Sequence, residues 1–358
     1  MKRHPLDPLN FSLLRPLDEF ARSHGLSITD LAAREGLLAS FRTSLEQHVS
    51  HEARLHGIRV ESMFAYVVAA MGACDLISEE DAGTLFDDTG DLKRPDFRII
   101  TRDREHMLVE VKNFHQNSPR KPYRITGKYL ASLKRYAQLN NVPLRIAIYW
   151  SRWNMWSLLD AARLDESKKN IDISMSDAFL HNEMYLLGDC MIGTLPPLSL
   201  RLYADTTKPR SVNSQGQTGF TVSKACLCCD GNDIDDPTER RIAWFLIRNG
   251  NWHEIEQVAE IKNRLVDYVE MRVSPQDPPD GESSEQRFRS VGFMSQMITS
   301  QYLRPTSNGN NIATLAPKKQ PDHFGLLIPK DYEGLALKLW RFTMLPKHVD
   351  YATIKVAT

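Results

Sequence analysis

Two acidic residues and a lysine stand in a stretch that otherwise reads as a buried hairpin, "RPDFRIITRDREHMLVEVKN" (residues 94–113). Asp96 precedes the first apolar run, and Glu110 and Lys112 lie in the second. Residues two apart on a strand point to the same face, so Glu110 and Lys112 are expected to be neighbours. Carboxylates in a buried hairpin repel each other and lose their hydration, and a divalent cation between them removes that cost.

These residue types support metal-assisted hydrolysis. Hard carboxylate oxygens favour Mg²⁺ or Mn²⁺ over softer metals. A neighbouring lysine can orient or deprotonate a water molecule, or it can neutralise charge on a transferring phosphate. Metal-activated water beside a fixed cation is the chemistry of phosphodiester hydrolysis.

The turn between the two strands decides whether Asp96 can take part. A three-residue turn, from Arg102 to Arg104, places Asp96 opposite Glu110. A four-residue turn places Phe97 there instead and turns Asp96 away, because successive side chains alternate between faces. We therefore predict a register of even offset, or a bulge that restores it.

The combination of Pro95-Asp96, a step of 14 residues and Glu110-Val111-Lys112 resembles the PD-(D/E)xK phosphodiesterase superfamily. That family has a restriction-endonuclease-like fold, with a helix, a hairpin, a helix and a strand in order, here over roughly residues 50–160. The resemblance implies that Asp96, Glu110 and the carbonyl of Val111 bind the metal. It also implies that Lys112 serves the attacking water.

The first helix of that family often supplies a further acid, and Glu61 is the candidate here. Apolar residues between positions 60 and 71 of "GIRVESMFAYVVAAMG" (57–72) recur at helical spacing, which predicts a helix. Glu61 lies at the edge of this stripe, beside Phe64 and Val68. The resemblance implies that Glu61 reaches the metal directly or through water.

The Glu-x-Lys triplet alone is weak evidence, because it occurs three times, beginning at residues 110, 166 and 260. The second lies in a polar loop and the third in a segment that we predict to be helical. Only the first follows a Pro-Asp on an apolar strand, with an acid on the helix before and basic residues after. An alternative is a hairpin whose acids pair with Lys112 or nearby arginines, on a nuclease-like fold that is retained for binding.

A basic stretch follows the hairpin. No Asp or Glu occurs between Val111 and Leu159, although the chain as a whole has a net charge of zero. The same span contains nine cations: Lys112, Arg120, Lys121, Arg124, Lys128, Lys134, Arg135, Arg145 and Arg152. Such a surface attracts polyanions, whereas the alternative is a solvated face with acidic partners elsewhere. We predict phosphate contacts from a subset of these residues: Arg120, Lys121, Arg124, Lys128, Lys134 and Arg135.

The surrounding pattern predicts an α/β protein, and the resemblance implies a restriction-endonuclease-like core, a central mixed sheet flanked by helices. Residues 1–46 form a helical N-terminal extension, 47–160 the nuclease-like domain and 161–358 an α+β accessory domain for specificity, regulation or dimerisation. The predicted elements of the core are the following: a loop with short structured pieces at 75–91, a helix at about 125–140 and strands at 143–150 and 154–160.

In the accessory domain, strands are predicted within 182–205 and 219–229 and helices over 235–273, divided by Gly250. Asp236 followed by Pro237 fits a helix start. A helix-turn-helix over this pair is the alternative for sequence reading, although acids on the second helix disfavour a major-groove contact.

Two further patterns have structural explanations. Cys226 and Cys229 have zinc-ligand spacing, but only Cys190 and His181 lie near enough to complete a site, so small buried cysteines are expected. The three tryptophans in "YWSRWNMW" (149–156) are expected to pack the sheet, with base stacking as the alternative.

The longest apolar run, 64–73, is too short to cross a bilayer, and five cysteines make no disulfide framework. We therefore expect a cytoplasmic protein with no membrane partner. The leading hypothesis is a Mg²⁺- or Mn²⁺-dependent nuclease acting on DNA, most simply double-stranded. By resemblance its role would lie in restriction, phage defence, repair or mobile elements, and cutting both strands would suit a homodimer. The alternatives are a non-catalytic nucleic-acid-binding protein and a ligand-switched sensor on the same fold.

Overall fold

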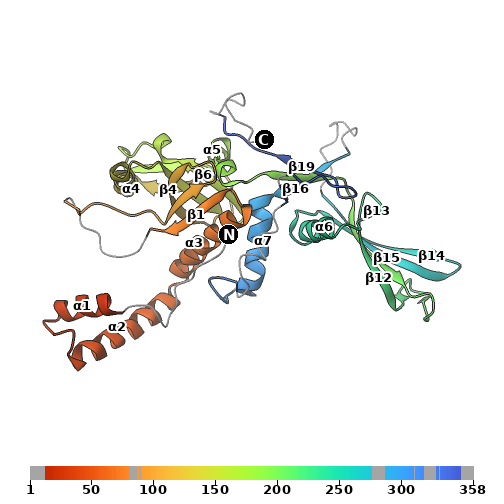
Figure 1. Ribbon diagram of the computed structural model, residues 1–358, viewed down its shortest axis with the longest axis horizontal. Helices are drawn as coiled ribbons and strands as arrows, with labels where there is room; N and C mark the ends of the chain where they lie inside the picture. The colour runs from red at the N-terminus through yellow and green to blue at the C-terminus, as the bar shows by residue number, and fades with distance from the viewer. Residues whose placement is uncertain are drawn as a thin grey trace.

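The computed structural model describes residues 13–80, 87–88, 90–275, 287–309, 311–317, 328–329 and 331–347. The chain begins with a helical arm, α1 (Leu14–Ser23) and α2 (Leu31–Ser50), which projects from the rest of the molecule (Figure 1). A third helix, α3 (Glu52–Met71), connects the arm to a five-stranded sheet. Among the described helices, none combines the length and apolar character that a bilayer crossing requires.

The central sheet has the strand order β1-β2-β3-β5-β6. Its strands are β1 (Cys74–Glu79), β2 (Phe97–Thr101), β3 (His106–Phe114), β5 (Leu144–Trp150) and β6 (Met155–Asp160). The β3–β5 pair is parallel and the other neighbouring pairs are antiparallel, so the sheet is mixed. The helix α4 (Gly127–Asn140) lies in the crossover between the two parallel strands. The predicted α/β class with a mixed sheet flanked by helices is therefore confirmed.

Two helices cover opposite faces of this sheet. Phe64 of α3 packs in one apolar cluster with Val109 and Val111 of β3. Leu133 of α4 packs in another cluster with Leu108. Because side chains on a strand alternate between faces, Glu110 and Lys112 share the α4 face with Leu108. The strand is buried on both sides, and this determines the environment of its two charged residues.

Two strands of this region were not among the predicted strands. The first is β1, within the 75–91 segment, whose residues 81–86 and 89 lie outside the described part. It is an edge strand with largely exposed side chains, so it carries no clear alternation of apolar residues. The second is β4 (Tyr123–Thr126), which pairs with β7 (Asn170–Ile173) far along the chain. Pairings of this kind leave little local signal in a sequence.

The chain continues to contact the central sheet after Asp160. Short helical elements follow β6, namely η1 (Ala161–Arg163), α5 (Met175–Leu180) and η2 (Met184–Leu187). Ala178 of α5 packs in the same cluster as α4. The predicted division of the chain near residue 160 stays a prediction.

Two further sheets occupy the C-terminal half. A five-stranded antiparallel sheet has the order β13-β12-β9-β15-β14, and a three-stranded sheet has the order β16-β8-β19. The strands of the larger sheet are β9 (Leu198–Ala204), β12 (Val222–Cys229), β13 (Asn232–Asp233), β14 (Glu254–Lys262) and β15 (Leu265–Ser274). Those of the smaller sheet are β8 (Met191–Thr194), β16 (Arg289–Phe293) and β19 (Leu339–Phe342). Short ladders join β10 (Ser211–Val212) to β11 (Thr218–Gly219) and β17 (Ser307–Asn308) to β18 (Asn311–Ile312).

Two helices accompany these sheets, α6 (Pro237–Asn249) and α7 (Met294–Thr306). As predicted, Asp236 caps α6, accepting hydrogen bonds from the backbone N–H groups of Thr238 and Glu239 at 2.8 and 2.9 Å. The helix α7 packs against α3, and Ile298 and Tyr302 join the cluster that contains Phe64. The C-terminal half therefore completes the core on the α3 side of the central sheet.

The helix predicted after Gly250 is wrong, because residues 254–274 form the β14–β15 hairpin. Its tight turn is Asn263-Arg264, both in the left-handed region with φ of 52° and 63°, as a two-residue hairpin turn requires. Glu, Ala and Lys on β14 favour helices intrinsically, and cross-strand pairing overrides that preference. A helix-turn-helix would need this second helix, so that alternative is also wrong.

The cysteines and tryptophans have structural roles. All five cysteines are free, and among the described residues no group of three or more His, Cys, Asp or Glu side chains is arranged to hold a metal. Cys226 and Cys229 stand three residues apart on β12, so their side chains point to opposite faces of the sheet and do not form the pair that a zinc site needs. Trp150 and Trp156 are fully buried, as expected for rings that pack the sheet. The Trp156 Nε1–H donates to Thr299 Oγ1 of α7 at 2.9 Å.

Candidate functional site

The β2–β3 hairpin has the register that brings Asp96 to Glu110. Phe97 pairs with Val109 and Ile100 with His106, so the residue numbers of each pair add to 206, and the next pair outward is Asp96 with Glu110. At the other end, the Thr101 N–H donates to the Glu105 carbonyl at 2.9 Å. The turn therefore spans the three residues 102–104, with Arg104 at a φ of 65°. The predicted even offset is confirmed.

Asp96 is fixed to the β3 backbone. It directly follows Pro95, which is buried, and its Oδ2 accepts a hydrogen bond from the Val111 N–H at 2.6 Å. Burial raises the pKa of Asp96 to about 7, with further contributions from the carboxylates of Glu110 and Glu61. Lys112 and the Val111 N–H act in the opposite direction, lowering the pKa without cancelling the increase. The carboxylates of Glu110 and Glu61 therefore both act on Asp96.

Glu110 lies at the centre of the polar contacts. Its side chain is 2% exposed, and its Oε1 accepts hydrogen bonds from Lys112 Nζ and from the Tyr129 hydroxyl of α4. Its other oxygen, Oε2, is buried without a hydrogen-bond partner among the described residues. A buried carboxylate oxygen without a partner is costly, and it is a hard donor of the kind that Mg²⁺ and Mn²⁺ prefer.

Lys112 is held as a cation. Burial acts to lower the pKa of Lys112, but Glu110 and the Tyr129 hydroxyl outweigh this effect, so its pKa lies above the usual value. Lys112 Nζ also donates to the Tyr129 hydroxyl at 3.1 Å. With its proton retained, this side chain is suited to orienting a water molecule or neutralising a phosphate, and poorly suited to removing a proton.

Two further residues of this site carried no sequence signal of their own. Tyr129 is four residues before the buried Leu133, on the apolar side of α4, yet its hydroxyl contacts both Glu110 and Lys112. Burial raises the pKa of Tyr129, as does Glu110, so the phenol keeps its proton. Lys93 is exposed and its ammonium lies 4.8 Å from the centre of the Tyr129 ring. Only the packing of α4 onto the hairpin brings these groups to the carboxylates.

Asp96 and Glu110 are neighbours, but their side chains are not arranged as a set of metal ligands. Within the described part of the chain, no three acidic, histidine or cysteine side chains have metal-holding geometry, and Glu110 is turned toward Lys112 and Tyr129. The donor chemistry nevertheless fits a hard divalent cation, since the buried Glu110 Oε2 has no described partner and Asp96 is crowded by acids. The predicted metal ligands Glu61, Asp96, Glu110 and the Val111 carbonyl therefore stay a prediction.

The six predicted phosphate-binding residues differ in their surroundings. Arg120, Lys121, Lys128 and Arg135 are exposed. Arg124 forms a two-pronged ion pair with Asp172 of β7 at 2.6 and 2.8 Å. Lys134 is half-buried, donates to the Leu164 carbonyl at 2.6 Å and pairs with Glu166.

Some of the basic stretch is thus neutralised by acids from later in the chain. Besides the pairs of Arg124 and Lys134, Arg145 contacts Asp160 at 3.1 Å and Glu183 at 2.6 Å. The alternative of acidic partners elsewhere is therefore correct for these cations. Of the six predicted phosphate-binding residues, the four exposed ones form no ion pair with another residue that the structure describes.

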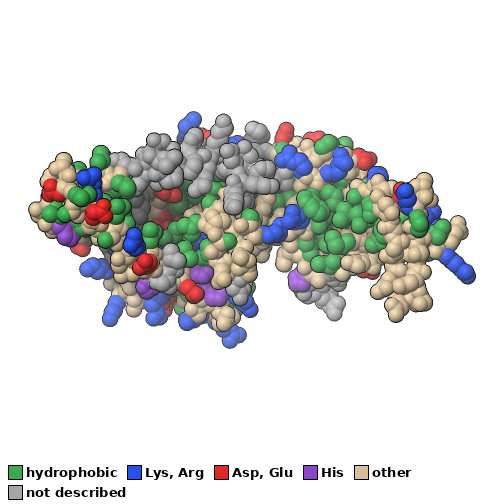
Figure 2. Space-filling view, turned by 90° about the horizontal axis from the view of Figure 1, so that it is seen from below, with side chains coloured by type: hydrophobic (Ala, Val, Ile, Leu, Met, Phe, Trp, Pro, Cys, Tyr) green, Lys and Arg blue, Asp and Glu red, His purple; other side chains and the backbone are tan. Residues whose placement is uncertain are grey.

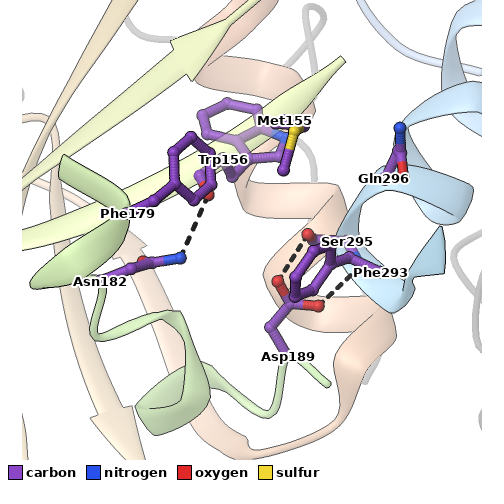
Figure 3. Close-up of a pocket in the computed structure, with 8 residues that line it drawn as sticks. All are labelled: Met155, Trp156, Phe179, Asn182, Asp189, Phe293, Ser295 and Gln296. Carbon is purple, nitrogen blue, oxygen red and sulfur yellow. Dashed lines mark hydrogen bonds between the residues drawn. The ribbon is translucent and has the colours of Figure 1, made fainter. Parts of the chain in front are cut away.

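A small cavity lies away from these residues. It is lined by Met155, Trp156, Phe179, Asn182, Asp189, Phe293, Ser295 and Gln296 (Figure 3). Asp189 accepts hydrogen bonds from the Ser295 N–H at 2.9 Å and from Ser295 Oγ at 2.6 Å. Burial raises the pKa of Asp189 to about 6, and the bonds from Ser295 moderate the rise. Asp189 accepts both hydrogen bonds from the first turn of α7, so its role is to hold this helix in place.

Comparisons with known proteins are sparse. No protein-family model matches the chain, and no curated protein matches it. Among solved structures, the chain is similar to a Holliday junction resolvase from Archaeoglobus fulgidus, an archaeal hyperthermophile. The two are 18% identical, the match covers 37% of this chain and 96% of the resolvase, and the TM-score is 0.29. A likeness at this level carries no weight for function, which rests on the contacts described above.

Proposed function

We propose that this protein is a metal-dependent nuclease that hydrolyses phosphodiester bonds, with DNA as its substrate and Mg²⁺ or Mn²⁺ as its cofactor. The observation that carries the proposal is the convergence of Asp96 with Glu61, Glu110 and Lys112. Burial of Asp96, together with the nearby carboxylates of Glu110 and Glu61, raises its pKa to about 7, a cost that a bound cation would remove. The confirmed hairpin register supports this site independently of any resemblance.

In this proposal the metal is held by Asp96, Glu110 and the carbonyl of Val111, and Glu61 reaches it directly or through water. The cation would supply an activated water molecule and would stabilise charge on the phosphate. The chain's own contribution is to fix the ligands: the Val111 N–H holds Asp96, and Tyr129 holds Glu110. Glu110 would turn its free oxygen toward the metal while its other oxygen keeps these contacts.

Lys112 would act as a fixed positive charge. Its pKa above the usual value favours orienting the attacking water and neutralising the phosphate, and it argues against a role as the base. Its contacts to Glu110 and Tyr129 hold the ammonium beside the carboxylates. A side chain held in this way needs little reorganisation during the reaction.

The nucleic acid would be held through its phosphates by Arg120, Lys121, Lys128 and Arg135, with Lys93 near the site. These side chains are exposed, and phosphate contacts of this kind are independent of sequence. Double-stranded DNA is the proposed form, with a dimer supplying one site for each strand. Restriction, phage defence, repair and mobile-element functions are the biological settings that fit such an enzyme.

Cleavage of plasmid DNA by the purified protein with Mg²⁺ or Mn²⁺ tests the proposal. We expect nicked or linear products from the wild type and none from Asp96→Ala, with DNA binding retained in a gel-shift assay with Ca²⁺. Glu260→Ala, in the Glu-x-Lys of the edge strand β14, is the matched control and should cleave like the wild type. If the wild type failed to cleave DNA with any divalent metal, the proposal of a metal-dependent nuclease would be refuted.

A non-catalytic or ligand-switched protein on the same fold is the second candidate. It is favoured by the engagement of Glu110 with Lys112 and Tyr129, because these contacts hold one oxygen of the carboxylate without a metal. A binding protein would retain DNA affinity with no cleavage in any metal. A switched enzyme would cleave only after an activating ligand is added.

A further inference from the structure

The N-terminal arm has a small core of its own. Leu17 and Ala21 of α1 pack against Ala33 and Leu37 of α2, in a cluster separate from the two clusters of the central sheet. The arm projects away from the rest of the molecule (Figure 1). Two helices with so few buried residues gain little stability from their mutual packing alone.

A stripe of leucines runs along α2 outside this core. Leu31, Leu38 and Leu45 recur every seven residues, and their side chains are 64%, 56% and 64% exposed. Seven residues are close to two helical turns, so the three leucines lie in a line about 21 Å long. Apolar and charged side chains stand beside one another on the arm (Figure 2). A regular line of exposed leucines is unusual for a solvated face and indicates a contact surface.

Two opposite charges flank the stripe on one side. Glu35 and Arg42 lie roughly 60° and 40° round the helix from Leu38, in the same direction. Both side chains are exposed, and no ion pair joins either of them to another residue that the structure describes. They are also seven residues apart, with one toward each end of α2.

This pattern is complementary to itself when α2 is turned end for end. Leu38 then lies against its own copy, and Leu31 lies against Leu45. In antiparallel helices the same flank of each helix faces the other, so Glu35 meets Arg42 and Arg42 meets Glu35. A two-fold axis through Leu38 produces both ion pairs at once, as a symmetric dimer interface requires.

We propose that α2 is a self-association surface on which the leucine stripe of a second copy of this chain packs antiparallel. The reciprocal charges favour a second copy over an unrelated partner, because one helix provides both halves of the recognition. The inference does not depend on the nuclease proposal. If the nuclease proposal is also correct, a dimer formed through α2 contains two catalytic sites.

Sedimentation velocity of the full-length protein without nucleic acid, over a range of micromolar concentrations, tests the surface. We expect a dimer for the wild type and a monomer for Leu38→Glu. Ser40→Glu is the matched control, since two residues turn the helix by about 200° and place Ser40 on the other side. Circular dichroism should show equal helix content in all three proteins. A monomeric wild type, or a Leu38→Glu variant that stays dimeric, would overturn the proposal.

A charge exchange tests the antiparallel arrangement. Glu35→Arg alone and Arg42→Glu alone should each weaken association by roughly tenfold, because both reciprocal pairs become repulsive. The double variant Glu35→Arg/Arg42→Glu should restore the wild-type dissociation constant. Failure of the double variant to recover association would exclude this pairing. DNA cleavage is not measured here, so failure of the nuclease proposal would leave these results unaffected.

Discussion

Two hairpins of this molecule carry a Glu-x-Lys triplet, and only one of them has the surroundings of a site. In β3, Glu110 is 2% exposed and Lys112 is 25% exposed, and the strand lies between two neighbours. In β14, Lys262 is 66% exposed and the strand is at the edge of its sheet. Lys262 pairs with Asp267 of its own hairpin at 2.6 Å, away from any carboxylate cluster.

The turns explain part of this difference. The three-residue turn after β2 continues the register to Asp96, so a second carboxylate faces Glu110. The two-residue turn after β14 brings Lys262 opposite Leu265. A triplet therefore becomes a candidate metal site when the register supplies another acid and a covering helix removes water. The identity of the three residues alone does not decide whether a triplet forms such a site.

The largest contrast is expected between Asp96 and Glu260. Asp96→Ala removes a proposed metal ligand and should lower the cleavage rate by at least about a thousandfold, because the metal provides several kcal/mol of stabilisation. Glu260→Ala should leave the rate within about twofold. Plasmid cleavage at saturating Mg²⁺ measures both. Equal activity of the two variants would show that the triplet in β3 has no special role.

The two lysines sharpen the comparison. Lys112→Ala should reduce the rate by roughly a hundredfold, because it removes a preorganised charge, and should change DNA affinity little. Lys262→Ala should behave like the wild type. Single-turnover rates at several protein concentrations separate catalysis from binding. If Lys112→Ala lost affinity but kept its maximal rate, Lys112 would be a phosphate contact only.

The sequence predicted most of the first hairpin and little of the second. The two apolar runs were sufficient to predict β2 and β3, whereas the turn length was left open, and only the requirement that Asp96 face Glu110 favoured an even offset. The β14 strand was mistaken for a helix, because Glu, Ala and Lys favour helices and its pairing with β15 and the sheet is a tertiary effect. Tyr129 was missed for a related reason: its approach to Glu110 depends on the packing of α4. The cation partners Asp172 and Glu166 also come from distant parts of the chain.

The raised pKa of Asp96 predicts that the stability of the folded protein depends on pH. In the metal-free protein, the folded state retains a proton up to about pH 7, whereas the unfolded chain releases it near its ordinary value of 3.8. The folded state binds more protons in this interval, so its stability falls as pH rises from about 4 to about 7. Asp96→Asn should therefore raise the melting temperature by several degrees at pH 8 and have little effect at pH 4.

Thermal denaturation of the wild type and of Asp96→Asn in EDTA, at pH 4 and at pH 8, measures this effect. Added Mg²⁺ should stabilise the wild type at pH 8 and leave Asp96→Asn unchanged. If the wild type and Asp96→Asn had the same melting temperature in EDTA at pH 8, the neighbouring carboxylates would not destabilise the protein as proposed.

The smallest expected effect separates exposed from paired cations on α4. Lys128 is exposed, whereas Lys134 is held by the Leu164 carbonyl and Glu166. Lys128→Ala should weaken DNA binding a fewfold and reduce the slope of log affinity against log salt by about one, because one phosphate contact is lost. Lys134→Ala should keep the wild-type slope and lower the melting temperature, because it removes a tie between α4 and the following loop. Fluorescence anisotropy at several salt concentrations measures the slope. A reduced slope for Lys134→Ala would show that the acids of the later chain do not neutralise the basic surface.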